Sequence, residues 1–268
     1  MKKLFVFFCL ILIAFTSFGQ DSTEKRREPR KDRREDKRTR IDAMIRQEEE
    51  GVLSYQKQSA FGIQLRTDGY GIFYELGRYR SPRFANLYLI ELTEIKHKKE
   101  EKTTVSDGFF SNSFIYGKLN NFYQLKLGFG QQYIFGQKGN KNGIAVMGIY
   151  QGGLNVGLLR PYYLSVFDNN TARDIKFDSQ DSVLFLTGDI QGSSGLGKGW
   201  NELKVKPGIF IKTGLRFDFG RYNEMIQAIQ IGIGVEAFAQ KIPLFYRSEE
   251  SQQIFYQGHI AFLFGRRK

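Results

Sequence analysis

The chain has 268 residues and a formal net charge of +12, and it is rich in aromatic residues (15%) and in glycine, with 29 copies. Its single cysteine, Cys9, excludes an internal disulfide. Its two histidines, His97 and His259, lie too far apart in the sequence to give a metal-ligand spacing, so we expect no metal and no cofactor.

Residues 1–19 have the pattern of a secretory signal peptide. Two lysines precede an apolar run, Leu4–Phe15, and small residues stand where a signal peptidase reads. We expect cleavage between Gly19 and Gln20, because the run is shorter than the ~20 apolar residues that the alternative, an uncleaved membrane anchor, needs. Cleavage would also remove Cys9 and leave no cysteine nucleophile or thiolate ligand.

The following segment, residues 20–54, is almost entirely charged and has little apolar surface to bury. Its apolar residues near the end have helical spacing, which predicts a short helix around Arg38–Glu50 in an otherwise extended periplasmic linker. Residues 21–50 are either a solvated linker or a docking arm for another outer-membrane or periplasmic protein or an anionic surface. Because the chain is exported, we expect no nucleic acid as a partner.

From residue 59 onward the main signal is a period of two, in which apolar residues alternate with glycine, glutamine or charged residues. Such alternation predicts strands with one apolar and one polar face. Eight segments show it: 59–66, 70–77, Asn86–Lys96, Phe122–Ile134, Gly143–Leu158, Gly208–Gly220, Ile226–Gln240 and Gln253–Phe264.

These strands predict an all-β fold, a transmembrane antiparallel up-and-down β-barrel over residues 55–268, with the apolar face toward lipid and the polar face toward a narrow lumen. Eight strands place both termini in the periplasm, with short periplasmic turns and long outer loops. Ten strands are the alternative, if Phe114–Gly117 and Val183–Thr187 pair. The expected location is the outer membrane of a Gram-negative bacterium.

The polar faces carry nine charged or titratable residues that we expect to form a lumenal charge network. Four are basic and four acidic, with the histidine uncounted, and lone buried charges are costly, so they should pair across the lumen. We expect the network to fill the barrel and to leave no aqueous channel. Its members are Arg66, Glu75, Glu91, Lys126, Lys212, Arg216, Asp218, Glu236 and His259.

Four lysines lie where the third strand ends at the outer rim, and they indicate a possible contact with lipopolysaccharide phosphates or, alternatively, a solvated strand end. They are Lys96, Lys98, Lys99 and Lys102.

The outer loop Gly192–Gly199, GSSGLGKG, comes close to a phosphate-binding loop but has Gly199 in place of the hydroxyl residue and no helix after it. We therefore expect Gly192–Gly199 to be a glycine-rich loop that binds no phosphate, with Trp200 as a packing anchor.

The segments Leu203–Glu224 and Phe114–Gly130 resemble stretches of an uncharacterised family of outer-membrane β-barrel proteins from Bacteroidota-type bacteria. The resemblance covers most of residues 55–268. It implies a barrel fold and an outer-membrane location, and it brings no catalytic residues.

Three functions remain open at this point. The first is a non-enzymatic barrel that acts as a scaffold or as a subunit of an outer-membrane assembly. The second is a small-solute pore, which eight strands make difficult. The third is a lipid-modifying enzyme, for which neither His97 nor His259 has a visible serine and acid partner set. We expect no catalytic residues.

Overall fold

The structure is a computed structural model, and it describes residues 56–98, 100–106, 111–138, 143–168, 171–178, 180–195, 197–221, 224–246 and 252–268. The chain divides into two compact units, Met1–Gly51 and Val52–Lys268, and the described residues all belong to the second unit. The expected signal peptide at 1–19 and the whole of the charged segment at 20–54, with its short helix, therefore lie outside the described residues.

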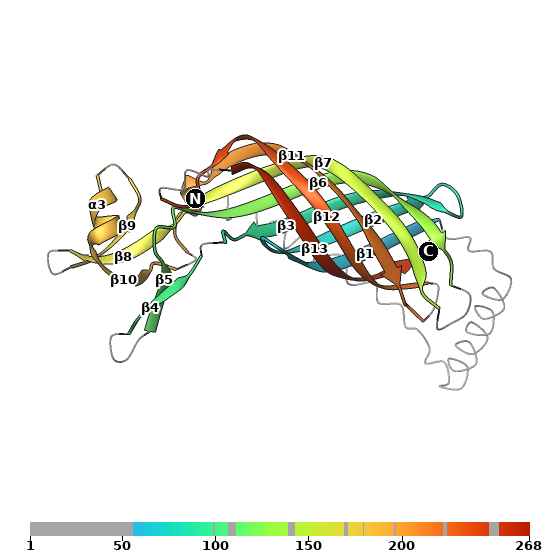
Figure 1. The fold of residues 1–268 in the computed structure, drawn as a ribbon, viewed down its shortest axis with the longest axis horizontal. Helices are drawn as coiled ribbons and strands as arrows, with labels where there is room; N and C mark the ends of the chain where they lie inside the picture. The colour runs from blue at the N-terminus through green and yellow to red at the C-terminus, as the bar shows by residue number, and fades with distance from the viewer. Residues whose placement is uncertain are drawn as a thin grey trace, which may run out of the picture. The chain divides into compact units, whose positions relative to one another are not determined.

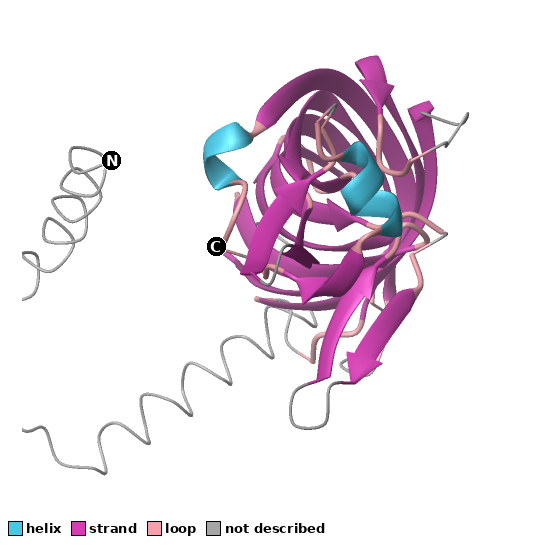
Figure 2. Ribbon diagram, turned by 90° about the vertical axis from the view of Figure 1, so that its left-hand side faces the viewer, coloured by secondary structure: helices cyan, strands magenta, loops and turns pink. Residues whose placement is uncertain are grey.

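Eight antiparallel strands close into a barrel in the order β1-β13-β12-β11-β7-β6-β3-β2 (Figure 1). Figure 2, seen from the end that carries β8–β10, shows these strands curving around a common axis. The predicted eight-stranded antiparallel barrel is confirmed, and each predicted segment overlaps one strand. The strands are β1 (Lys57–Arg66), β2 (Gly69–Tyr79), β3 (Phe84–Ile95), β6 (Asn120–Gly136), β7 (Ala145–Pro161), β11 (Lys204–Asp218), β12 (Met225–Ile242) and β13 (Gln252–Arg267).

Side-chain alternation explains how the sequence builds the barrel wall. Successive residues of a strand point to opposite faces of the sheet. In β1, Phe61, Ile63 and Leu65 are therefore exposed on the outside, whereas Gln64 and Arg66 are buried on the inside. The same inversion of the usual protein pattern, apolar outside and polar inside, recurs around the barrel.

The ten-strand alternative is wrong, because neither extra segment joins the barrel. Residues 114–117 fall at the end of β5 (Ser111–Ile115) and in the turn after it, and β5 pairs only with β4 (Lys102–Ser106). Residues 183–187 belong to a short helix, α3 (Ser182–Thr187), rather than to a strand. A short apolar run looks alike in a strand and in a buried helical turn, so its sequence could not separate the two.

A smaller sheet of β8 (Tyr163–Asp168), β9 (Thr171–Lys176) and β10 (Asp189–Ser193) stands at one end of the barrel (Figure 1). The short helix η1 (Trp200–Glu202) leads from it back into β11. With α3 and β5, this sheet encloses an apolar cluster of its own: Phe114, Tyr162, Leu164, Val166, Ile175 and Phe185. We call this the loop end of the barrel, and the opposite end, with its short connections, the turn end. Within the described residues, no helix is long and apolar enough to cross a membrane.

Candidate functional site

The lumen of the barrel holds all nine members of the predicted charge network. They project from the inner faces of seven strands and none is more than 7% exposed: Arg66, Glu75, Glu91, Lys126, Lys212, Arg216, Asp218, Glu236 and His259. The inward positions follow directly from the two-residue period of each strand. Which of them meet depends on height along the barrel, and the structure divides them into three groups.

Glu91 forms the centre of the first group. Its two carboxylate oxygens accept from the ammonium groups of Lys126 and Lys212, each at 2.7 Å. Lys126 also lies 2.7 Å from Glu236, so one ammonium group bridges two carboxylates. Charge-assisted contacts of this length are among the strongest hydrogen bonds in proteins.

Arg66 completes this group from β1. Its guanidinium lies 2.8 Å from Glu236 and donates to Asp68 at 2.8 Å. Gln124 donates to the second oxygen of Glu236 at 2.8 Å. Three cations thus face three carboxylates. Because every charge has an opposite charge beside it, the cost of burial is offset locally.

The second group lies nearer the turn end and is centred on Arg216 and Glu75, whose Nη2 and Oε2 atoms are 2.5 Å apart. Gln230 and Gln132 accept the remaining guanidinium N–H bonds at 2.8–3.3 Å. Gln151 donates to the other Glu75 oxygen at 2.8 Å. Neutral amides therefore complete the hydrogen bonding of this pair.

Aromatic rings lie close to both lysines of the first group. Phe73 and Phe210 are each 2% exposed and belong to an apolar cluster inside the barrel. The Lys212 ammonium is 5.2 Å from the centre of the Phe73 ring, and the Lys126 ammonium is 5.6 Å from that of Phe210. A cation held over an aromatic face is attracted to it, so the apolar layer also contributes to holding the charges.

Asp218 does not meet Lys212 or Arg216, although the three residues share one face of β11. It is fully buried at the turn end and accepts from Arg267, from Lys138 at 3.2 Å, and from the N–H of Gly220 at 2.9 Å. Sequence reasoning missed both of these cations. Extending the alternation of the last strand by three residues places Arg267 on the inner face, whereas Lys138 lies in a connection and carries no such signal.

An apolar plug closes the lumen toward the loop end. The Phe122 ring packs against the rings of Phe238 and Phe255, at centroid distances of 5.3 and 5.9 Å. Leu244 comes from the β12–β13 connection and joins this cluster, and its carbonyl accepts from the N–H of Leu119 at 2.8 Å. The loop is thereby tied across the barrel mouth. The inward phenylalanines interrupt the polar face, which was the only sequence signal for the plug.

The two histidines lie in different surroundings. His259 is buried in the lumen, with its Nε2 atom 3.3 Å from the Gln230 amide nitrogen. His97 packs its ring against Phe245 at a centroid distance of 4.9 Å. Throughout the described ranges, no three His, Cys, Asp or Glu side chains gather as a metal site requires.

The loop-end lysines are partly described. Lys96, Lys98 and Lys102 are exposed, and Lys99 lies outside the described residues. The Lys96 ammonium is 4.9 Å from the centre of the Tyr70 ring, and the Tyr70 hydroxyl donates to Glu94. One of the lysines is therefore held against the barrel wall.

Trp200 anchors the chain where the glycine-rich loop returns to the barrel. Its ring stacks on Tyr123 at a centroid distance of 5.7 Å, and the Arg160 guanidinium lies 4.9 Å from it. Gly199 precedes it with a φ of +85°, which favours glycine. Glu202 is the last residue of η1, and the side chains of Lys176 and Tyr163 both donate to its carboxylate. These hydrogen bonds lower the pKa of Glu202.

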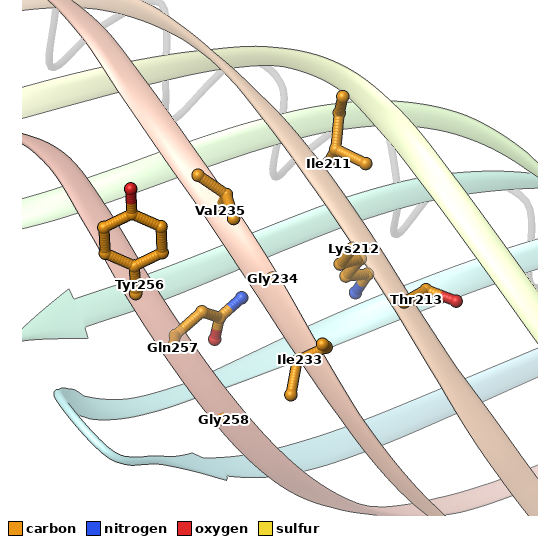
Figure 3. A pocket seen from close by; sticks show the side chains of 9 residues that line it. All are labelled: Ile211, Lys212, Thr213, Ile233, Gly234, Val235, Tyr256, Gln257 and Gly258. Carbon is orange, nitrogen blue, oxygen red and sulfur yellow. The ribbon is translucent and has the colours of Figure 1, made fainter.

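Two shallow hollows lie on the outer wall, where the sheet carries small residues. One, of about 420 Å³, is bordered by Ile211, Ile233 and Tyr256 (Figure 3). Lys212 and Gln257 also border it through their backbone region, but both are buried on the lumenal face. The second, of about 470 Å³, adjoins it across Thr213.

Comparison with known proteins gives no family-model match and no match among curated proteins. Solved structures similar to this chain include the N-terminal β-barrel domain of Pseudomonas aeruginosa OprF (8% identity, 79% of this chain and 99% of that chain covered, TM-score 0.37). Neisserial surface protein A is another (9%, 79% and 96%, 0.37). Ail, the attachment invasion locus protein of Yersinia pestis, is a third (7%, 79% and 96%, 0.34). Identities this low say nothing of a shared activity.

Proposed function

We propose that this chain is a non-enzymatic β-barrel of the Gram-negative outer membrane, of the Bacteroidota-type family that it resembles, and that it acts as a scaffold or subunit of an outer-membrane assembly. The observation that carries this proposal is a lumen filled by paired charges and an apolar plug inside a wall whose outer face is apolar. A wall of this kind suits lipid, and a filled lumen leaves the surfaces at the two ends as the working parts.

The outer face supports the membrane placement. Soluble proteins rarely expose contiguous apolar patches larger than a few hundred Å². Here large apolar side chains follow one another around the barrel at 40–70% exposure, and they come from every strand; examples are Phe61, Ile72, Ile90, Phe129, Leu154, Ile211, Ile233 and Ile260. Contact with hydrocarbon explains such a surface, because a closed antiparallel sheet pairs the backbone groups of each strand with its two neighbours.

The filled lumen disfavours the pore. Between the plug around Phe122 and the Asp218 group at the turn end, the two ion-pair groups and the Phe73 and Phe210 rings are all buried. Ions crossing the barrel would have to displace paired charges from a narrow interior. The enzyme alternative has no support from the positions of His97 and His259.

The loop end supports the scaffold role. The elements gathered there share an apolar cluster and still expose large apolar side chains: Tyr116 (55%) after β5, Phe167 (44%) in β8 and Val183 (71%) in α3. Contiguous exposed apolar patches mark contact surfaces, and we propose that these side chains contribute to one. We propose that this surface and residues 21–50 bind protein partners, and that the loop-end lysines 96, 98, 99 and 102 contact lipopolysaccharide phosphates.

Affinity purification of the tagged full chain from gently solubilised, cross-linked membranes tests the scaffold role. We expect the same partner proteins in repeated purifications, and we expect Val183→Asp to lose the partners that bind at the loop end. Gln252→Asp, at an exposed position of β13 at the same end of the barrel but outside this sheet, is the matched control. Repeated recovery of the chain alone would contradict the scaffold role, and stepwise conductance in planar bilayers would favour the pore instead.

A second measurement tests the membrane placement itself. The folded chain should fractionate with the outer membrane and migrate differently in gels before and after boiling. Solubility without detergent would contradict the placement.

A further inference from the structure

Three cations stand side by side on the outer face of the barrel at its turn end. Lys57 of β1 is the direct cross-strand partner of Arg78 in β2, and Arg266 of β13 is opposite Ser59, two residues further along β1. Directly opposite residues have Cβ atoms ~5 Å apart and diagonal ones ~7–8 Å apart. Lys57 therefore lies within reach of both arginines. All three side chains point outward and are exposed, and we call them the cation row.

The residues opposite the two arginines, other than Lys57 itself, are neutral, and the main chain of Lys57 exchanges hydrogen bonds with that of Lys268. The cross-strand neighbours of its arginines are Asn86, Ser59 and Met225. Within the described part of the chain, no carboxylate makes an ion pair with any of the three cations. Arg267 provides the contrast, because it turns inward and pairs with Asp218.

Like charges placed directly opposite each other destabilise a sheet. The cation row therefore favours occupation by an anion, which would remove that repulsion.

The exposed apolar surface of the barrel wall begins immediately beside the cation row. The next outward residue after Arg78 in β2 is Leu76, which is 48% exposed, and the next after Arg266 in β13 is Phe264, which is 56% exposed. In β1 the outward series from Lys57 continues through Ser59 to Phe61. An anion bound to the row would thus be continuous with a surface suited to hydrocarbon.

We propose that the cation row binds the phosphate of an anionic glycerophospholipid in the leaflet at the turn end, with the acyl chains lying along the adjoining apolar wall. This inference rests on the proposed membrane placement. Arginine side chains offer forked N–H donors that match phosphate oxygens, and lysine adds a third positive charge. The direct passage from arginine to exposed apolar side chains in β2 and β13 favours a lipid over a soluble anion.

Native mass spectrometry of the detergent-solubilised full chain, titrated with phosphatidylglycerol or phosphatidylcholine, tests the proposal. The variant is Lys57→Gln with Arg78→Gln and Arg266→Gln. The matched control, Lys204→Gln with Lys206→Gln and Lys241→Gln, removes the same charge at the loop end. We expect the parent chain and the control to prefer phosphatidylglycerol, and the preference to fall by about fivefold for each row cation removed. Soluble glycerol phosphate should not compete.

The proposal is overturned if the parent chain shows no preference, if the row variant keeps it, or if the control loses it equally. Competition by glycerol phosphate would assign the site to a soluble anion and would also overturn it. If the triple variant does not fold, Arg266→Gln alone, at the exposed end of β13, should still lower the preference. Failure of the chain to insert into any bilayer contradicts the proposed membrane placement, whereas insertion without lipid preference contradicts this inference alone.

Discussion

Arg216 and Glu75 are 141 positions apart in the sequence and meet across the lumen at 2.5 Å. The two residues belong to β11 and β2, which are not neighbours in the barrel. Their contact therefore does not follow from strand pairing. The pair can form only when the barrel is closed and narrow. The contribution of this pair to the free energy of unfolding is therefore a measure of barrel closure.

Replacing one member of this pair should destabilise the barrel strongly. Arg216→Leu leaves the buried Glu75 carboxylate without its ion-pair partner, and breaking a buried pair in this way costs about 3–5 kcal/mol. Replacing both partners, with Arg216→Met and Glu75→Gln, should cost less than either single change, because no lone charge remains. Urea unfolding of the refolded chain in detergent measures both. An additive double variant would show that the two residues do not act as a pair.

Glu91 should be more sensitive than Glu75, because it accepts from two ammonium groups rather than one cation. Glu91→Gln would leave Lys126, Lys212 and Arg66 with only Glu236 and Asp68 as counter-charges, so we expect a loss larger than that of Glu75→Gln, above about 3–5 kcal/mol. The same unfolding experiment ranks the two variants. Equal losses would mean that the first ion-pair group does not depend on its central carboxylate.

Alternation was sufficient to predict the wall and the face of each lumenal charge, whereas the preference for eight strands over ten came from placing both termini on one side. It could not predict partners, because a two-residue period gives the face of a side chain but not its height along the barrel. Height depends on register and strand tilt, which are properties of the closed sheet. Lys212 meets Glu91 and not Glu236, and Asp218 meets Arg267 and Lys138, for this reason.

The loop-end sheet could not be predicted because its strands are too short to show a period. β8, β9 and β10 have five or six residues each, and α3 has six. Their order depends on a shared apolar cluster that also draws Phe114 from a distant hairpin. Such long-range packing overrides the local preferences of short segments.

Phe122 should be necessary for the apolar plug. It is fully buried between Phe238 and Phe255, and removing a buried ring of this size costs about 3–5 kcal/mol through lost contacts and the cavity left behind. Phe129 lies on the outer face of the same strand and is 49% exposed, so Phe129→Ala is the matched control. Unfolding in detergent should show a much larger loss for Phe122→Ala. Similar losses would contradict a plug held by inward packing.

Gly153 should tolerate no side chain, and Gly136 should tolerate one. A Cβ atom on Gly153 would lie 2.1 Å from the carbonyl oxygen of Leu127 and 2.7 Å from the Cα atom of Gly128, both backbone atoms of the neighbouring strand β6. The clash cannot be relieved by rotating a side chain, so Gly153→Ala must push β6 and β7 apart. We expect a destabilisation of about 1–3 kcal/mol.

At Gly136, at the end of β6, nothing lies within 4 Å of the added atom. Gly136→Ala should therefore be neutral, or stabilising by up to about 1 kcal/mol, because alanine restricts the unfolded chain. The temperature at which the gel shift of the folded barrel is lost measures both variants under identical conditions. If both variants lowered this temperature equally, the close approach of β6 and β7 would not explain why glycine stands at position 153.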